Sequence, residues 1–167
     1  IVTEDGKLYS FGYNYRGQLG HGTTVSELVP RPVKGLEGKR VRLVSCSYYH
    51  TVVTTDSDEA YSFGRNDFGQ LGHGDNTDKK FPQSIDDLKG RRIVSLGCGQ
   101  YHTAVVTSSG TVLACGKNDY GQLGVEKVSC RRACSSSSSS LVRYACLSHT
   151  FSHTQNSPWL REMLTRG

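Results

Sequence analysis

The 167-residue sequence has no apolar run that approaches the roughly 18 residues needed for a membrane-spanning helix. It also lacks an initiator methionine and the pattern of a secretory signal peptide at its start. We therefore expect no membrane span, and we interpret the chain as one whose natural beginning is missing. Its six cysteines occur without any sign of secretion, so we expect reduced thiols and an intracellular protein, in the cytoplasm or the nucleus.

Most of the chain lacks an excess of charge of either sign. Residues 1–127 contain 15 Lys and Arg against 14 Asp and Glu, whereas residues 128–167 contain five Arg and one Glu. A nucleic-acid-binding domain concentrates positive charge on its folded part. Because the excess here lies in the final segment, we do not expect the rest of the chain to bind nucleic acid.

Motifs for catalysis and for cofactors are also missing. No Gly-x-Ser-x-Gly elbow occurs, and Gly97-Cys98-Gly99 is followed by His102 where a dinucleotide loop has its third glycine. We therefore expect no enzymatic activity, no cofactor and no metal. One alternative is a zinc site, although a C-x3-C spacing is unusual for structural zinc. Its candidate ligands are Cys130, Cys134, Cys146, His149 and His153.

What the sequence does contain is a repeat of 52 residues. The segments KLYSFGYNYRGQLGHG (7–22), EAYSFGRNDFGQLGHG (59–74) and TVLACGKNDYGQLGVE (111–126) align at this offset without insertion. Between them, VSCSYYHTVVTT (44–55) aligns with LGCGQYHTAVVT (96–107). Three copies in a fixed register indicate a repeated structural unit. Histidines at this spacing, such as His50 and His102, fall in different units, which argues against a shared metal.

Each repeat has the pattern of short strands. Residues 50–55 and 103–107 are rich in β-branched side chains, a turn follows each of them, and strand candidates at 60–63 and 111–114 complete two hairpins. Residues 41–45 and 92–96 are candidates for a third strand. Residues 29–33 and 81–85 are candidates for an outer strand, where Pro30, Pro32 and Pro82 suit an edge.

Four short strands in about 50 residues are typical of a β-propeller blade. The sequence thus predicts an all-β fold, a partial β-propeller with two full blades and the start of a third. The repeats run over about 6–57, 58–109 and 110–127.

The recurring residues are predicted to build the scaffold. Asn14 lies three residues before Gly17, as in a type I turn, and Gly12 ends a strand where a bulge or a positive φ is expected. The signature comprises Gly12, Asn14, Gly17, Gly20, His50, Gly64, Asn66, Gly69, Gly72, His102, Gly116, Asn118, Gly121 and Gly124.

The pattern YSFGxNxxGQLGHG, followed by CxxxHT, resembles the repeats of the regulator of chromosome condensation family over residues 1–127. The resemblance implies a seven-bladed ring of roughly 350 residues, of which this chain supplies only a part. Family members include a guanine-nucleotide exchange factor for the GTPase Ran that docks on nucleosomes, and propellers within HECT-type ubiquitin ligases, BTB-domain proteins, kinases and ciliary scaffolds. The exchange factors insert a β-wedge into one blade, and both complete spacings here leave no room for it.

Positions that differ between the repeats are the candidates for contacts with a partner, because scaffold positions must recur and contact positions need not. Aromatic residues and arginine are good interface anchors. Ordinary drift of surface residues is the alternative explanation. The predicted partner-binding residues are Tyr13, Arg16, Arg65, Phe68, Lys117 and Tyr120.

The pattern stops after Gly124. Residues 128–167 contain a run of serines at 135–140 and no strand alternation, which predicts an irregular tail. This tail is interpreted as a product of a lost reading frame or splice pattern, or as a natural disordered segment.

The function predicted from these features is a protein–protein interaction module within a larger intracellular regulatory protein. One alternative is a guanine-nucleotide exchange factor for a Ran-like small GTPase. A second is the propeller segment of a HECT-type ubiquitin ligase, whose catalytic cysteine would lie elsewhere. In each case the expected partner is another protein, such as a small GTPase, and not a small-molecule substrate.

Overall fold

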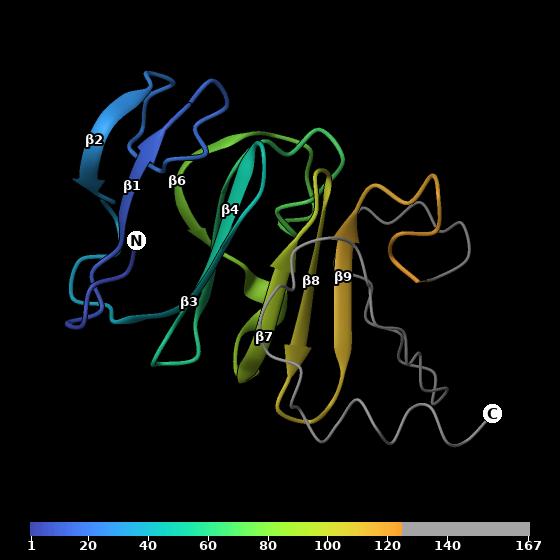
Figure 1. The fold of residues 1–167 in the computed structure, drawn as a ribbon. Helices are drawn as coiled ribbons and strands as arrows, with labels where there is room; N and C mark the ends of the chain where they lie inside the picture. The colour runs from blue at the N-terminus through green and yellow to red at the C-terminus, as the bar shows by residue number, and fades with distance from the viewer. Residues whose placement is uncertain (125–167) are drawn as a thin grey trace, which may run out of the picture.

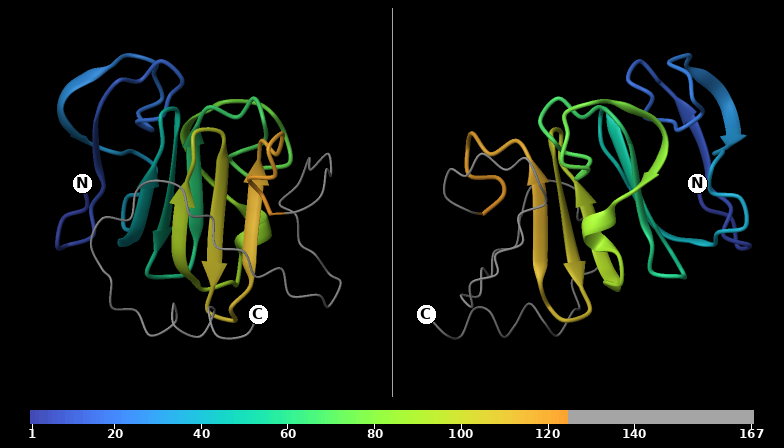
Figure 2. Two further views of the ribbon diagram at one scale, coloured as in Figure 1. Left: turned by 45° about the vertical axis from the view of Figure 1, so that its right-hand side comes forward. Right: turned by 180° about the vertical axis from the view of Figure 1, so that it is seen from behind.

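The computed structural model describes residues 1–124, and within them it contains antiparallel sheets and no α-helix. The first sheet pairs β1 (Tyr9–Gly12) with β2 (Glu27–Pro32). The second has the order β3 (Val41–Cys46), β4 (His50–Thr55), β5 (Ala60–Gly64) and β6 (Lys79–Ser84). After a short 3₁₀ helix, η1 (Asp86–Leu88), the third has the order β7 (Ile93–Cys98), β8 (His102–Thr107) and β9 (Val112–Gly116). The three sheets lie side by side in chain order, with the second sheet between the first and the third (Figures 1 and 2).

The predicted all-β partial propeller is confirmed, but the strands are divided differently from the prediction of two full blades. Among residues 1–124, only the second sheet has four strands, and it lies between a two-stranded and a three-stranded sheet. The repeat 6–57 therefore supplies the two outer strands of one blade and the two inner strands of the next. Sequence periodicity sets the length of the unit, whereas hydrogen bonding between consecutive strands sets where each sheet begins.

Two apolar layers hold the sheets together. Val53 of β4 packs with Phe63 of β5 in the layer towards the first sheet, and its neighbour Val52 packs in the layer towards the third. All three side chains are fully buried, and burying one valine is worth roughly 2 kcal/mol.

In the second layer Cys115 stands at the position equivalent to Phe63, and a cavity of about 20 Å³ lies beside it.

Prolines occupy the outer strands as expected. The N–H of Val33 donates to Leu8 O at 2.9 Å, and that of Ile85 donates to Ala60 O at 2.9 Å, so these residues pair inwards. Alternation directs the nitrogen of Pro32 outwards, where no ladder partner is needed, and Pro30 and Pro82 lie where the register with β1 and β5 shifts.

The sheets have two ends that differ in character. We call one the loop face: it carries the turns 13–20, 65–72 and 117–124 and the loops 47–49 and 99–101, and it is at the top of Figure 1. We call the other the hairpin face: it carries the β4–β5 and β8–β9 connections, at the bottom of Figure 1.

On the loop face, the main chains of the turns 65–72 and 117–124 are each joined to the neighbouring loop of the same sheet. Arg65 N donates to Tyr49 O at 2.8 Å, and Lys117 N donates to Tyr101 O at 2.8 Å. Gly64 has a φ of +108°, and a Cβ there would lie 2.3 Å from Tyr49 O. Glycine is therefore required at this position if the turn and the loop are to meet.

No helix in the described part of the chain is long and apolar enough to cross a membrane. The Ser-rich tail and the candidate zinc ligands lie outside the described residues. Within residues 1–124, no group of three or more His, Cys, Asp and Glu side chains is placed to hold a metal ion.

Candidate protein-binding surface

An asparagine shapes each turn of the loop face, and it is fully buried in the first two turns. Asn66 donates from Nδ2 to Asp75 O at 2.9 Å and to Asp75 Oδ1 at 2.9 Å, and its Oδ1 accepts from Leu71 N at 2.9 Å. Gly69 N also donates to Asn66 O at 2.9 Å, which closes the turn between i and i+3. Asn14 holds the first turn in the same way, and both asparagines are fully buried. The residues beside each asparagine are thereby held at the surface in a fixed geometry.

The signature residue His50 connects the second and third sheets. Thr103 Oγ1 donates to Gln70 O at 2.7 Å, so it must accept from His50 Nε2, which is 2.9 Å away. His50 Nδ1 is then the acceptor for Ser47 Oγ, at 2.8 Å. Burial, with a smaller effect from the nearby His102, lowers the pKa of His50 to about 4. The ring is therefore neutral near pH 7 and serves as a fixed structural contact.

A second histidine contact recurs within the turns. Ser62 Oγ donates to Leu71 O at 2.8 Å and accepts from His73 Nε2 at 2.9 Å. Ser10 and His21 form the same pair in the first turn, at 3.0 Å. The third repeat has Ala114 and Val125 at these positions, so both members of the pair are replaced together. Desolvation lowers the pKa of His73 and of His21, which again favours the neutral ring.

Three of the predicted partner-binding residues meet where the second and third sheets adjoin. The guanidinium of Arg65 lies over the rings of Tyr49 (5.2 Å), Phe68 (5.9 Å) and Tyr101 (5.1 Å). Lys117 Nζ lies over Phe68 (5.1 Å) and Tyr101 (5.7 Å). We call these five residues the cation–aromatic cluster. It contains Arg65, Phe68 and Lys117 together with two tyrosines that sequence comparison did not select.

The cations of the loop face are neutralised by neighbouring carboxylates. Arg65 pairs with Asp67 at 2.6 Å, and Lys117 pairs with Asp119 at 3.1 Å. Arg16, in the first turn, reaches the second sheet and pairs with Asp78 at 3.1 Å. These side chains therefore join turns to one another, and the surface they form carries little net charge.

The most exposed aromatic side chains on this face are tyrosines. Tyr13 and Tyr120, both selected from the sequence, are 61% and 90% exposed, and Tyr15 and Tyr48, which were not selected, are 70% and 75% exposed. Tyr13 and Tyr15 stack with their ring centroids 6.0 Å apart. Tyr15 aligns with Asp67 and Asp119, and Tyr48 aligns with Gln100, so variation between the repeats was the signal that could have identified them.

Adjacent antiparallel sheets follow the 52-residue repeat, and the same contact joins them twice: Thr51 Oγ1 donates to Gln18 O at 2.8 Å, and Thr103 Oγ1 donates to Gln70 O at 2.7 Å. This arrangement defines the chain as part of a repeat-built β-propeller. The chain belongs to the regulator of chromosome condensation (RCC1) repeat family. A model of this repeat matches residues 5–54 and 57–106, and a second model of the same repeat matches residues 41–70 and 93–122.

Several curated proteins are similar to the chain along 74% of its length. The Ultraviolet-B receptor UVR8 of Arabidopsis thaliana is 37% identical over 123 residues, and the E3 ubiquitin-protein ligase HERC2 of Homo sapiens is 38% identical over 125 residues. The Protein RCC2 homolog of Danio rerio is 37% identical over 124 residues. The chain spans 28% of UVR8, 25% of the RCC2 homolog and 3% of HERC2.

Solved structures show the same fold. Human WBSCR16 matches with a TM-score of 0.69 at 25% identity, over 79% of this chain and 33% of that protein. Prp20p from Saccharomyces cerevisiae, whose structure is described together with its binding to Gsp1p and histones, matches with a TM-score of 0.64 at 21% identity. That match covers 77% of this chain and 33% of Prp20p.

Proposed function

We propose that the chain is part of a protein-interaction propeller within a larger intracellular regulatory protein, and that its loop face binds the partner. The observation that carries this proposal is the gathering of four tyrosines at one end of the sheets, each more than 60% exposed. Exposed aromatic side chains at this density are costly to leave in water unless a partner covers them.

The chemistry of the loop face suits protein recognition. Tyrosine offers a large apolar ring with a polar tip, and it loses little conformational entropy on binding. The turns that carry Tyr13, Tyr15 and Tyr120 are fixed by Asn14 and Asn118, so little further ordering is needed when a partner docks. In the proposal, Tyr13 and Tyr120 contact the partner directly, while Arg16, Arg65, Phe68 and Lys117 form a supporting surface around them.

The test compares exposed aromatic side chains on the loop face with one on an outer strand. In a double variant, Tyr48→Ala with Tyr120→Ala, we expect the affinity for the partner to fall about tenfold or more. The control is Phe81→Ala on the outer strand β6, outside the turns and loops that form the loop face, where the ring is 53% exposed and lies against Gly22. The proposal fails if the double variant binds as tightly as the wild type, or if the control weakens binding equally.

Nucleotide exchange on a Ran-like GTPase is the second candidate. It is favoured by the fold shared with Prp20p, for which binding to Gsp1p is described. An exchange factor accelerates the release of labelled nucleotide from the GTPase, whereas a simple interaction module binds without acceleration. Similarity to HERC2 supports the third candidate, a propeller within a ubiquitin ligase, in which this segment would recognise a partner and a distant cysteine would perform the chemistry.

A further inference from the structure

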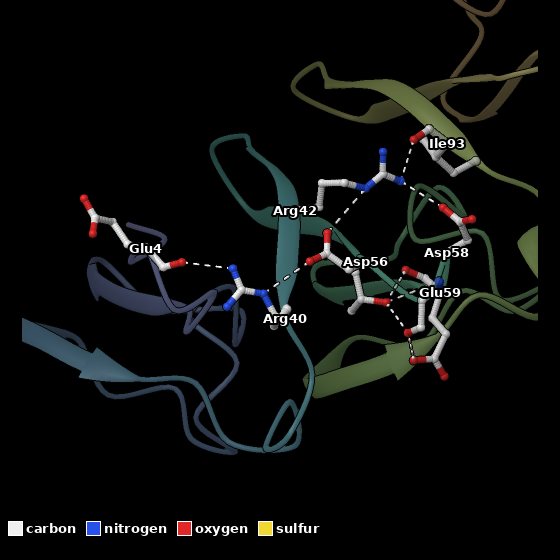
Figure 3. Close-up of polar contacts among 9 residues, drawn as sticks. Glu4, Arg40, Arg42, Asp56, Asp58, Glu59 and Ile93 are labelled. Atoms are coloured by element: carbon white, nitrogen blue, oxygen red, sulfur yellow. Dashed lines mark hydrogen bonds and ion pairs between the residues drawn. The ribbon is translucent and has the colours of Figure 1, made fainter.

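The hairpin face of the second sheet is a balanced ionic network (Figure 3). Arg40 Nε donates to Asp56 Oδ2 at 3.3 Å, and Lys39 pairs with Glu59 at 2.6 Å. Arg42 pairs with Asp58 at 3.1 Å and also donates to Ile93 O of the third sheet at 2.9 Å. Three cations thus face three carboxylates on this hairpin.

One of these carboxylates belongs to a residue whose backbone conformation is unfavourable for any residue other than glycine. Asp58 has a φ of +57°, in the left-handed region, and the equivalent positions of the other two repeats are Gly6 and Gly110. A non-glycine residue in this conformation costs on the order of 1 kcal/mol, which the pairing with Arg42 offsets. A carboxylate at this position therefore belongs specifically to the second sheet.

The third sheet has two of the three cations of this hairpin and none of its three carboxylates. At an offset of 52 residues, Lys39 and Arg40 correspond to Arg91 and Arg92. The three carboxylates and Arg42 are replaced by uncharged residues. The hairpin of the third sheet therefore has two cations and no carboxylate at the equivalent positions. In chain order these replacements are Val94 for Arg42, Ser108 for Asp56, Gly110 for Asp58 and Thr111 for Glu59.

The main chain places the residues of the two hairpins identically. Asp56 N donates to Arg40 O at 2.9 Å, and Ser108 N donates to Arg92 O at 2.8 Å. The pairing of Ile93 with Thr107 likewise repeats that of Val41 with Thr55. Ser108 therefore lies beside Arg92 where Asp56 lies beside Arg40, but it brings no charge.

Nearby acidic side chains do not replace the missing partners. Asp86 is paired with Lys89 at 2.8 Å, and Arg91 Nε donates to the backbone oxygen of Asp87 at 3.3 Å. Within the described part of the chain, neither Arg91 nor Arg92 forms an ion pair, and both side chains are exposed. The hydroxyls of Ser109 and Thr111, 3.1 Å apart, lie at the same hairpin tip.

We infer that Arg91, Arg92 and Ser108 form a second interaction surface, on the hairpin face of the third sheet, for an acidic segment of a partner protein. A carboxylate of that segment takes the place beside Arg92 that Asp56 has beside Arg40. A further carboxylate pairs with Arg91 as Glu59 pairs with Lys39. This surface lies at the opposite end of the sheets from the loop face, so it is independent of the function proposed above.

The test uses the full chain and a fluorescently labelled hexaglutamate peptide at low ionic strength, with a hexaglutamine peptide as the reference. Arg92→Gln should weaken binding of the glutamate peptide about threefold to fivefold, which is the scale of one exposed ion pair. Lys34→Gln is the matched control, because it removes one exposed positive charge elsewhere, after β2. It should leave the affinity within the error of the wild type.

Two further variants exchange the chemistry of the two hairpins. Ser108→Asp supplies the missing carboxylate internally and should weaken peptide binding as much as Arg92→Gln does. Asp56→Ser frees Arg40 and should increase the number of peptides bound from one to two. Both variants change a surface hairpin tip, and their far-UV circular dichroism should match the wild type.

Three results would overturn the inference: equal binding of the glutamine peptide, equal weakening by Lys34→Gln, or unchanged binding by Ser108→Asp. The double variant Tyr48→Ala with Tyr120→Ala should bind the glutamate peptide like the wild type. Failure of this second surface is therefore distinguishable from failure of the loop-face proposal.

Discussion

Replacing Asn66 with alanine tests whether the turn signature holds the loop face in place. Its side-chain amide is fully buried and makes three hydrogen bonds, two to Asp75 and one from Leu71 N. Alanine can make none of them, and it leaves the buried N–H of Leu71 and the carbonyl of Asp75 without their partners.

The expected cost follows from the groups left unsatisfied. A buried polar group that loses its partner costs about 1–3 kcal/mol, and the N–H of Leu71 is such a group, so the free energy of unfolding should fall by about 2 kcal/mol in Asn66→Ala. The two hydrogen bonds to Asp75 add little, because that residue is exposed and water replaces the amide.

The measurement is urea unfolding followed by far-UV circular dichroism, for the wild type, Asn66→Ala and the control Asn76→Ala. Asn76 is exposed in the same connection between β5 and β6, and its replacement should cost less than about 0.5 kcal/mol. A cost below about 1 kcal/mol for Asn66→Ala, or equal costs for the two variants, would refute the reasoning.

The remaining predictions concern burial and the incomplete ring. Because burial lowers the pKa of His50 to about 4 from 6.5, its neutral form contributes about 3 kcal/mol above pH 6.5 that is lost as the pH falls towards 4; pH-dependent urea unfolding should show this loss, and His50→Gln should reduce it to the part that other histidines such as His21 and His73 contribute. Phe63→Ala should destabilise the protein by about 3–5 kcal/mol and Cys115→Ala by about 1 kcal/mol, since the layer at Cys115 already contains a cavity; equal costs in urea unfolding would contradict this. Burial raises the pKa of Cys98 and of Cys115 to about 12, so mass spectrometry after brief alkylation at neutral pH should find Cys46 modified well before either. One edge of β9 pairs with no strand within residues 1–124 and should make the chain associate, and a sharp, cooperative melt of a monomer by sedimentation and calorimetry would argue against that.

The sequence was sufficient to predict the strands and the turns. β-branched runs identified β4 and β8, and the spacing of Asn66 and Gly69 predicted a turn whose hydrogen bond the structure contains. The sequence did not reveal where one sheet ends and the next begins. A repeat can be cut at any point of its period, and only the hydrogen bonds between β3, β4, β5 and β6 define the blade.

The candidate surface was only partly predictable, for a different reason. Variation between repeats selected Arg65 and Lys117, but it could not show that rings from another sheet cover their charges. Tyr101 supplies one of those rings, and its position relative to Arg65 depends on how two sheets pack. Exposure likewise depends on packing, which is why Tyr48 was missed and proved to be one of the most exposed aromatic residues.

Site-specific photo-cross-linking tests the central claim most directly. A photoreactive phenylalanine analogue would replace Tyr48, Tyr120 or the outer-strand residue Phe81 in the full chain, which would then be irradiated in an extract of its native cells. If the loop face binds the partner, positions 48 and 120 will cross-link to the same protein and position 81 will not. Cross-links from position 81 alone, or none from positions 48 and 120, would contradict the account.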